Sequence, residues 1–257
     1  MSSSALGLHV VSSVAPAAAA PADLPGVWRG SELARTAQAV LPSGHAALDA
    51  ELPGGGWPRG QLSEILQAQP GLHEWRLLLP ALQVAAQRGP LVLVGAPHLP
   101  HLPVLAALGL PPERLLRIEA RTPAERLWAA EQALRCQALG ALLAWLPQVR
   151  GEQLRRLQLN AQGSAAGQAL LFVMRALDAQ RESSPAPLRL AVQAGEGTQL
   201  AVQLLKRRGP LLDRPLALAA PLPVLAVLRP SRSRTPDPSH AVDRPARART
   251  PRSTAAA

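Results

Sequence analysis

Aromatic residues are scarce in this sequence: its 257 residues include no Tyr, one Phe and five Trp. Since 47% of the residues are still hydrophobic, wholesale disorder is excluded, and Leu, Val and Ala must fill the core. The only cysteine, Cys136, excludes an internal disulfide. It falls on the apolar side of a helical pattern, so we expect a buried thiol without a redox role.

Basic residues are missing from the start of the chain, where none precedes Arg29. The stretch "VVSSVAPAAAAPA" therefore lacks the charged beginning of a signal peptide. The best candidate for a membrane span, "LALAAPLPVLAVL" at 216–228, contains two prolines and is shorter than the roughly 20 apolar residues that a spanning helix needs. We expect a cytoplasmic protein that makes no membrane contact.

Lysine is nearly absent: Lys206 is the only one, and arginine supplies the rest of the positive charge behind a net charge of +10. Half of that net charge lies at 229–252, where seven Arg accompany two Asp. The remainder is spread over the chain without a visible basic stripe. We therefore expect at most weak DNA binding, and the Arg-rich tail is either a contact for DNA or an acidic partner, or a solubilising segment.

Apolar runs of strand length alternate with longer segments of helical period between residues 61 and 174. Such runs, buried on both faces and separated by helices, are typical of a parallel sheet in an α/β domain. The predicted strands are 61–66, 91–96, 115–120, 141–146 and 168–174, and the predicted helices are 74–89, 102–109, 122–140 and 150–163. Two alternating stretches at 188–193 and 198–205 predict an antiparallel hairpin at one edge of the sheet.

The composition changes at both ends of this alternating region. Residues 1–26 are rich in Ser, Ala and Pro, and residues 216–257 are rich in Pro and Arg. We predict a disordered lead at 1–26, one α/β domain at 27–215 and a largely disordered tail at 216–257.

One segment carries a specific family resemblance. The stretch "LPSGHAALDAELPGGGWPRGQLSEIL" at 41–66 resembles the approach to the nucleotide loop in RecA-type ATPases, with a small-residue turn, a glycine cluster and a strand bearing Glu. The similarity extends over roughly residues 40–213. It implies a RecA-like core with a mostly parallel sheet, in which the glycine cluster is a turn that launches a central strand.

The nucleotide loop itself departs from that family. Where RecA-type proteins have a leading Gly, a phosphate-binding Lys and a magnesium-binding hydroxyl, this sequence has Gln67, His73 and Glu74. A Glu adds negative charge where phosphates would lie, and Pro70 removes one amide donor. The pattern G-x-x-x-x-G-K-[ST] is missing, so we expect a degenerate loop that holds no nucleotide cofactor.

Three more positions of the family's catalytic set are substituted. Pro97 stands where the family has the acidic residue that activates water, Trp145 where it has the magnesium-linked Asp, and Arg175 where it has the Gln that senses the γ-phosphate. Without these groups we expect no catalytic residues and no enzymatic activity. His98 and His101 have no ligand-spaced Cys or carboxylate beside them, so they are interpreted as loop residues, and no metal site is predicted.

The candidate contact residues for a partner protein or DNA are basic or aromatic. "LLKRRGPL" resembles the strand end at which RecA-type proteins present basic residues to a neighbouring subunit, although both DNA-binding loops of that family are shortened here. Two tryptophans lie in turn-rich segments, where an exposed Trp would be an interface anchor. These candidates are Lys206, Arg207, Arg208, Trp28 and Trp57. The other notable tryptophans, Trp128 and Trp145, are expected in the core.

The combination of motifs is similar to ImuA, the SulA/RecA-like family associated with translesion DNA synthesis. It includes "WRGSELA", "LDAELPGGGWPRGQLSEIL", "LWAAEQALR", "LAWLP", "LRRLQLNAQ" and "LKRRG". The resemblance implies a damage-inducible accessory protein of the SOS response that acts in mutagenesis. Its implied partners are the Y-family-like protein ImuB, RecA and, indirectly, an error-prone DnaE-type polymerase.

Two other functions remain open from the sequence. SulA, which inhibits cell division by acting on FtsZ, resembles the same fold without the nucleotide loop. An unorthodox RecA-type ATPase would use different residues for the same chemistry. The leading hypothesis is a non-catalytic accessory protein that works through contacts with ImuB, RecA or both.

Overall fold

The computed structural model describes residues 39–163 and 168–220. Three predictions fall on residues outside this range and stay predictions. They are the disordered lead at 1–26, the contact role of Trp28, and the part of the Arg-rich tail from residue 221 onward. Among the described residues no helix has the length and apolar character needed to cross a membrane.

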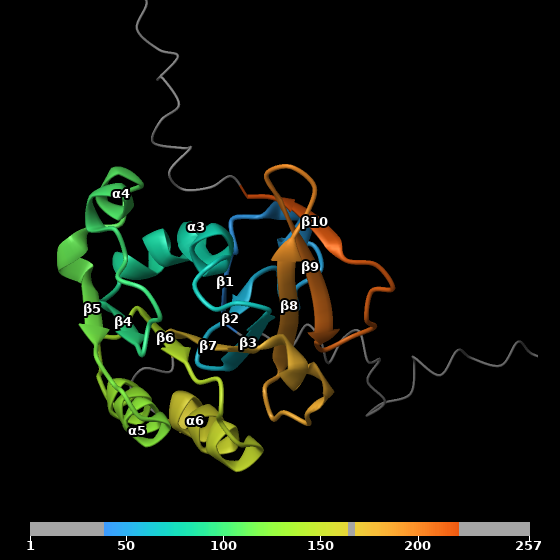
Figure 1. Cartoon of the computed structure of the whole chain (residues 1–257). Coiled ribbons are helices and arrows are strands. Elements are labelled where there is room, and N and C mark those ends of the chain that lie inside the picture. Colours follow the sequence, from blue (N-terminus) through green and yellow to red (C-terminus); the bar gives the residue numbers. More distant parts are fainter. Residues whose placement is uncertain (1–38, 164–167, 221–257) are drawn as a thin grey trace, which may run out of the picture.

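A single large sheet forms the centre of the described chain (Figure 1). Its strands are β3 (Leu62–Gln67), β4 (Leu91–Val94), β5 (Leu115–Ile118), β6 (Ala141–Trp145), β7 (Leu170–Ala176), β8 (Leu188–Ala194), β9 (Gln199–Lys206) and β10 (Leu216–Ala219). Their order across the sheet is β10-β9-β8-β3-β7-β6-β4-β5. The pairs from β8 to β5 are parallel, whereas β8–β9 and β9–β10 are antiparallel.

This architecture confirms the predicted fold class, a mostly parallel sheet flanked by helices with an antiparallel hairpin on one side. Strand β10 corrects the predicted domain boundary, because residues 216–219 pair with β9 and so extend the sheet beyond residue 215. A separate two-stranded sheet joins β1 (Val40–Leu41) to β2 (Trp57–Pro58). The glycine cluster lies just before β2, with Gly54 and Gly55 at φ values of 79° and 83° that favour glycine.

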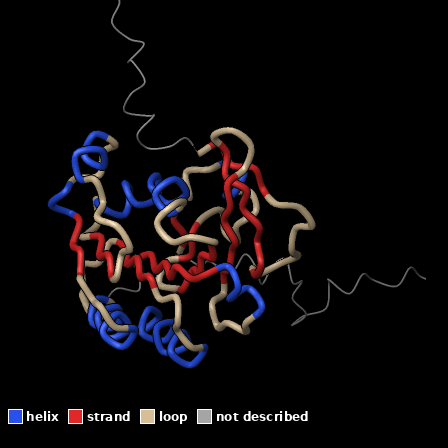
Figure 2. The backbone as a smooth tube through the Cα atoms, viewed as in Figure 1, coloured by secondary structure: helices blue, strands red, loops and turns tan. Residues whose placement is uncertain are grey.

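Helices cover both faces of the large sheet, as the tube in Figure 2 shows. They are α2 (Ala46–Asp49), α3 (Glu74–Ala86), α4 (Leu102–Ala107), α5 (Pro123–Ala133) and α6 (Gly151–Gly163), with short 3-10 helices η2 (Pro112–Arg114) and η3 (Leu177–Arg181). One hydrophobic cluster packs α3 against the sheet, and a second packs α5 and α6 against the other face. The start of α5 is fixed by a capping box between Thr122 and Glu125.

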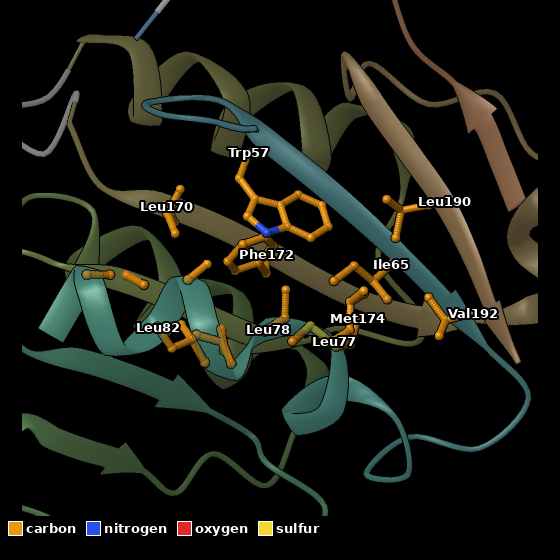
Figure 3. Packing of buried hydrophobic residues seen from close by; sticks show 14 of the residues in the cluster. Trp57, Ile65, Leu77, Leu78, Leu82, Leu170, Phe172, Met174, Leu190 and Val192 are labelled. Carbon is orange, nitrogen blue, oxygen red and sulfur yellow. The ribbon is translucent and has the colours of Figure 1, made fainter. Parts of the chain in front are cut away.

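The core on the α3 face is built around an aromatic pair (Figure 3). The ring of Trp57 meets that of Phe172 edge to face, with centroids 5.1 Å apart, among Leu, Ile and Met side chains. Trp57 is fully buried, so the prediction that it is an exposed contact residue is wrong: the turn folds its side chain under the sheet. Trp145 is buried as predicted.

Two residues in and after α5 that were predicted to be buried are exposed instead. Trp128 was expected in the core, but it is 65% exposed. Cys136 was expected to be buried, but its thiol is exposed just after α5 ends. The helical stripe that faces the sheet consists instead of Leu127 and the alanines Ala129, Ala130 and Ala133. Small residues suffice there because α5 packs close to the strands.

Candidate functional site

The degenerate nucleotide loop joins the end of β3 to the start of α3. Gln67 ends the strand and is buried, and Glu74 begins the helix and is also buried. Between them the chain turns at Gly71, whose φ of 94° favours glycine. A side chain at Gly71 would collide with the ring of His98, so the 96–101 loop packs directly over the turn.

The carboxylate of Glu74 lies inside this loop and accepts hydrogen bonds from several directions. The backbone amides of Gly71 and His73 donate to it at 2.6 and 3.1 Å. The indole Nε1 of Trp145, from the end of β6, donates to it at 2.8 Å, and the side-chain amide of Gln67 donates to the same oxygen. Two of the substituted family positions, Gln67 and Trp145, therefore both contact a third, Glu74.

This arrangement places an internal anion at a helix N-terminus. Backbone amides at such a terminus, together with the helix dipole, form the anion site that phosphate-binding loops use. Here the side chain of Glu74 takes the amides of Gly71 and His73, and Trp145 adds a neutral donor. The carboxylate balances the positive end of α3 and satisfies the two loop amides and the indole N–H that point at it.

The remaining residues around the loop offer little positive charge. Burial lowers the pKa of His73, and the nearby Arg76 lowers it further against the opposing effect of Glu74. The imidazole is therefore neutral at pH 7 and does not replace the missing lysine cation. Pro97 lies beside Gly71, and a small hollow of about 170 Å³ between this loop and Trp145 is lined mainly by apolar and histidine side chains.

Arg175, the last of the three substituted catalytic positions outside the loop, belongs to a different cluster. Its guanidinium donates to Glu64 on β3 at 2.9 Å and to Glu182 at 2.7 Å. Arg189 on β8 donates to the other oxygen of Glu64 at 2.5 Å. Burial by itself would lower the pKa of Arg175, but the hydrogen bonds with Glu182 and Glu64 outweigh it and raise that pKa.

This buried Arg–Glu–Arg cluster links three adjacent strands. Glu64 lies opposite Arg189 in the β3–β8 register, and Arg175 lies two residues beyond the partner of Glu64 on β7. Glu64 and Gln67 are three positions apart, so their side chains lie on opposite faces of β3. Arg175 therefore does not approach the degenerate loop, and its cluster is a structural clamp of the central sheet.

The three basic candidates at the end of β9 do not form one surface. Arg207 is largely buried: it pairs with Glu51 at 2.8 Å and donates to the carbonyl of Pro210 at 2.6 Å. The Lys206 ammonium donates to the carbonyl of Ser184 at 2.7 Å, and Arg208 is exposed. Arg207 was predicted as a contact residue, but its guanidinium is paired with Glu51 and fastens the end of β9 to the segment after α2.

The fold and this loop define a class: an α/β domain whose phosphate-type loop is filled by one of its own carboxylates. Comparison with known proteins identifies a family resemblance for part of this domain. Residues 60–169, from just before β3 to just after α6, match the family model described as Cell division inhibitor SulA. That segment is therefore SulA-like.

Two curated relatives agree with this match. The cell division inhibitor SulA of Photorhabdus laumondii subsp. laumondii is 32% identical over 115 residues, which are 44% of this chain and 63% of that protein. The cell division inhibitor SulA of Edwardsiella piscicida is 29% identical over 121 residues, 46% of this chain and 70% of that protein. This chain thus spans less than two thirds of the first relative. Both relatives carry the SulA name, and the finer resemblance to ImuA stays a prediction.

The sequence showed which loop residues are substituted, but it did not reveal the structural role of the residues that replace them. Glu74 was treated only as a negative charge that repels phosphate, whereas it is the acceptor around which the loop folds. The available signal was its position directly after "PGLH", at the first turn of a predicted helix, where carboxylates are favoured. The exposed Trp128 had no such signal, because a helical pattern alone does not show which face meets the sheet.

Proposed function

We propose that this chain is a non-catalytic, SulA-like protein of the DNA-damage response that acts by binding a partner protein. The observation that carries the proposal is the Glu74 carboxylate, which occupies the loop amides that a nucleotide phosphate would need. A domain that has filled its phosphate site can still present its surface to other proteins. The chemistry of the substituted residues supports the absence of ATP hydrolysis. It does not indicate which protein is the partner.

ATP binding is the first expected negative result. Isothermal titration of the full chain with ATP and magnesium should give no heat of specific binding, because Glu74 repels the phosphates and His73 is neutral. The double variant His73→Lys/Glu74→Thr should also fail to hydrolyse ATP, since Pro97 and Trp145 still deny it a base and a metal ligand. Magnesium-dependent hydrolysis by the purified wild type would refute the non-catalytic proposal.

Inhibition of cell division is the specific function that we place first. The SulA-like segment contains the degenerate loop, α3 to α6 and the four strands from β3 to β6, so it includes most of the helical surface of the described domain. Both relatives are described as cell division inhibitors. We propose FtsZ as the partner for this function, because the resemblance to SulA implies it.

A second candidate is an accessory role in translesion synthesis, with ImuB or RecA as the partner. A specific observation favours keeping it: the described fold continues outside 60–169, with α2 and β1–β2 before it and β7–β10 after it. The flanking elements contain the first part of "LDAELPGGGWPRGQLSEIL" and all of "LKRRG", two of the motifs that resemble ImuA. A SulA-like segment inside a longer α/β domain is compatible with that family as well.

A capture experiment separates the two candidates. The immobilised full chain should retain purified FtsZ and, added to assembling FtsZ, should reduce the polymer that sediments. Retention of ImuB or RecA without FtsZ would favour the translesion role instead. Failure to retain any of the three proteins would refute the proposed function.

The basic end of β9 is tested in the same experiment. The variant Lys206→Ala/Arg208→Ala, with Arg207 kept, should fold normally because exposed charges contribute little to stability. If this end of β9 is the contact surface, capture should weaken, and more so at low salt where charge steers association. Arg207→Ala is not a suitable probe, since losing its pair with Glu51 would disturb the fold.

A further inference from the structure

A hollow lies between the starts of α5 and α6, away from the degenerate loop. It has a volume of about 620 Å³, within the roughly 300–1,000 Å³ typical of binding sites. Its walls are the start of α5, the segment after β6 and the start of α6, which lie on the same side of the sheet (Figure 1). We call it the α5–α6 groove.

The charge of the α5–α6 groove has one sign. Arg121, Arg126 and Arg150 line it, and none of the described residues that line it is acidic. A second hollow of about 370 Å³ shares Arg121 and Arg126 and adds the ion pair of Arg117 with Glu119. Because β5 ends just before Arg121 and β6 ends shortly before Arg150, the parallel strands bring these arginines to one edge of the sheet.

Local contacts hold the side chain of Arg126 in place, whereas the guanidinium groups of Arg121 and Arg150 stay available. Arg126 donates its Nε to the carbonyl of Ala120 at 3.0 Å, and its side chain packs against Gly95, where any larger residue would collide. The backbone amides of Thr122 and Arg121 donate to Glu125 and lower its pKa, so this carboxylate caps α5. No side-chain hydrogen bond of Arg121 or Arg150 is found within the described part of the chain.

An exposed tryptophan lies next to the groove. Trp128 is 65% exposed and shares a helix face with Ala124, one turn earlier, which lines the groove. Three residues further on, Glu131 pairs with Arg156 of α6 at 2.5 Å and ties the two helices together. Trp and Arg are the side chains most enriched at the energetic centres of protein interfaces.

We propose that the α5–α6 groove binds an acidic segment of a partner protein, whose carboxylates pair with Arg121, Arg126 and Arg150 and whose apolar residues cover Trp128. The proposal rests on the partner-binding function proposed above and gives it a site. The groove lies wholly within the SulA-like segment, unlike the basic end of β9.

The surroundings of the groove favour a peptide over a nucleic acid. Glu119, Glu125 and Glu152 are exposed in the same segments that carry the arginines, and Glu119 pairs with Arg117 at 2.6 Å. A phosphate chain running beyond the groove would meet these carboxylates, whereas nucleic-acid sites follow the backbone with continuous positive charge. A peptide needs to place only a few carboxylates in the groove itself.

The test uses fluorescence anisotropy with the full chain and a short fluorescein-labelled peptide of Asp, Glu and Leu. Wild type should bind this peptide and not the matched peptide in which Asn and Gln replace the acids. The variant Arg121→Glu/Arg150→Glu should bind at least about tenfold more weakly, and Trp128→Ala should weaken binding by a similar factor. The variant Arg181→Glu/Arg214→Glu changes the same charge at exposed sites outside the groove and should bind normally.

Three outcomes would overturn the proposal. They are equal binding of the acidic and amide peptides, equal weakening by the groove and control variants, and tighter binding of a short oligodeoxythymidylate that depends on Arg121 and Arg150. Circular dichroism shows whether each variant is folded, and Trp128→Phe keeps the test valid if Trp128→Ala does not fold.

The groove and the proposed function can fail separately. If wild type captures FtsZ or ImuB and the Arg121→Glu/Arg150→Glu variant captures it equally well, the groove is wrong and the partner-binding function stands. If wild type captures neither protein nor RecA, the proposed function fails whatever the acidic peptide does.

Discussion

Replacing Glu64 with leucine is expected to lower the free energy of unfolding by about 3–5 kcal/mol, because it leaves two buried arginines without their shared carboxylate. Glu64 is fully buried, and the side chains of Arg175 and Arg189 are 2% and 7% exposed. Removing one partner of a buried ion pair costs more than the pair contributes, since the remaining charges keep their desolvation penalty. Urea denaturation followed by circular dichroism measures the change.

Two controls separate this effect from a general loss of charge. Glu119→Leu removes a carboxylate from the exposed pair with Arg117 and should change stability by less than about 1 kcal/mol. The triple variant Glu64→Leu/Arg175→Met/Arg189→Met should be more stable than Glu64→Leu alone, because no buried charge is left unpaired. A loss below 1 kcal/mol for Glu64→Leu would show that the cluster does not clamp the sheet.

Replacing Glu74 with alanine is the second large expected effect, a loss of roughly 2–4 kcal/mol in unfolding free energy. The change removes the acceptor shared by the amides of Gly71 and His73, the indole of Trp145 and the side chain of Gln67. A buried donor left without an acceptor costs about 1–3 kcal/mol, and water entering the loop would recover part of that cost.

The matched control for Glu74→Ala is Glu152→Ala. Glu152 also lies in the first turn of a helix but is exposed, so its loss should cost less than about 1 kcal/mol. Glu74→Gln keeps one acceptor oxygen and should fall between wild type and Glu74→Ala. Equal stability of Glu74→Ala and wild type would mean that the carboxylate does not hold the loop together.

Periodicity alone predicted most of the elements, for a physical reason. Runs such as "LVLV" and "ALLAW" are apolar at every position, because both faces of these strands are covered and every residue is buried. The helices between them have a single apolar stripe each, which gives the helical period. Strand β10 was missed because four residues beside a proline-rich tail carry no period of their own. It forms only because the edge of β9 is available to pair with it.

The sequence by itself determined most of the strands and helices and which family positions are substituted, because strand and helix periods and residue identity are local properties. The tertiary structure decided where each side chain lies. It brought Gln67, Glu74 and Trp145 together from three segments, turned Arg175 toward Glu64, buried Trp57 and exposed Trp128. It also brought Arg121, Arg126 and Arg150 to one groove. Such contacts depend on strand order and on which face of each element meets the sheet, and neither is encoded in the residues of one segment.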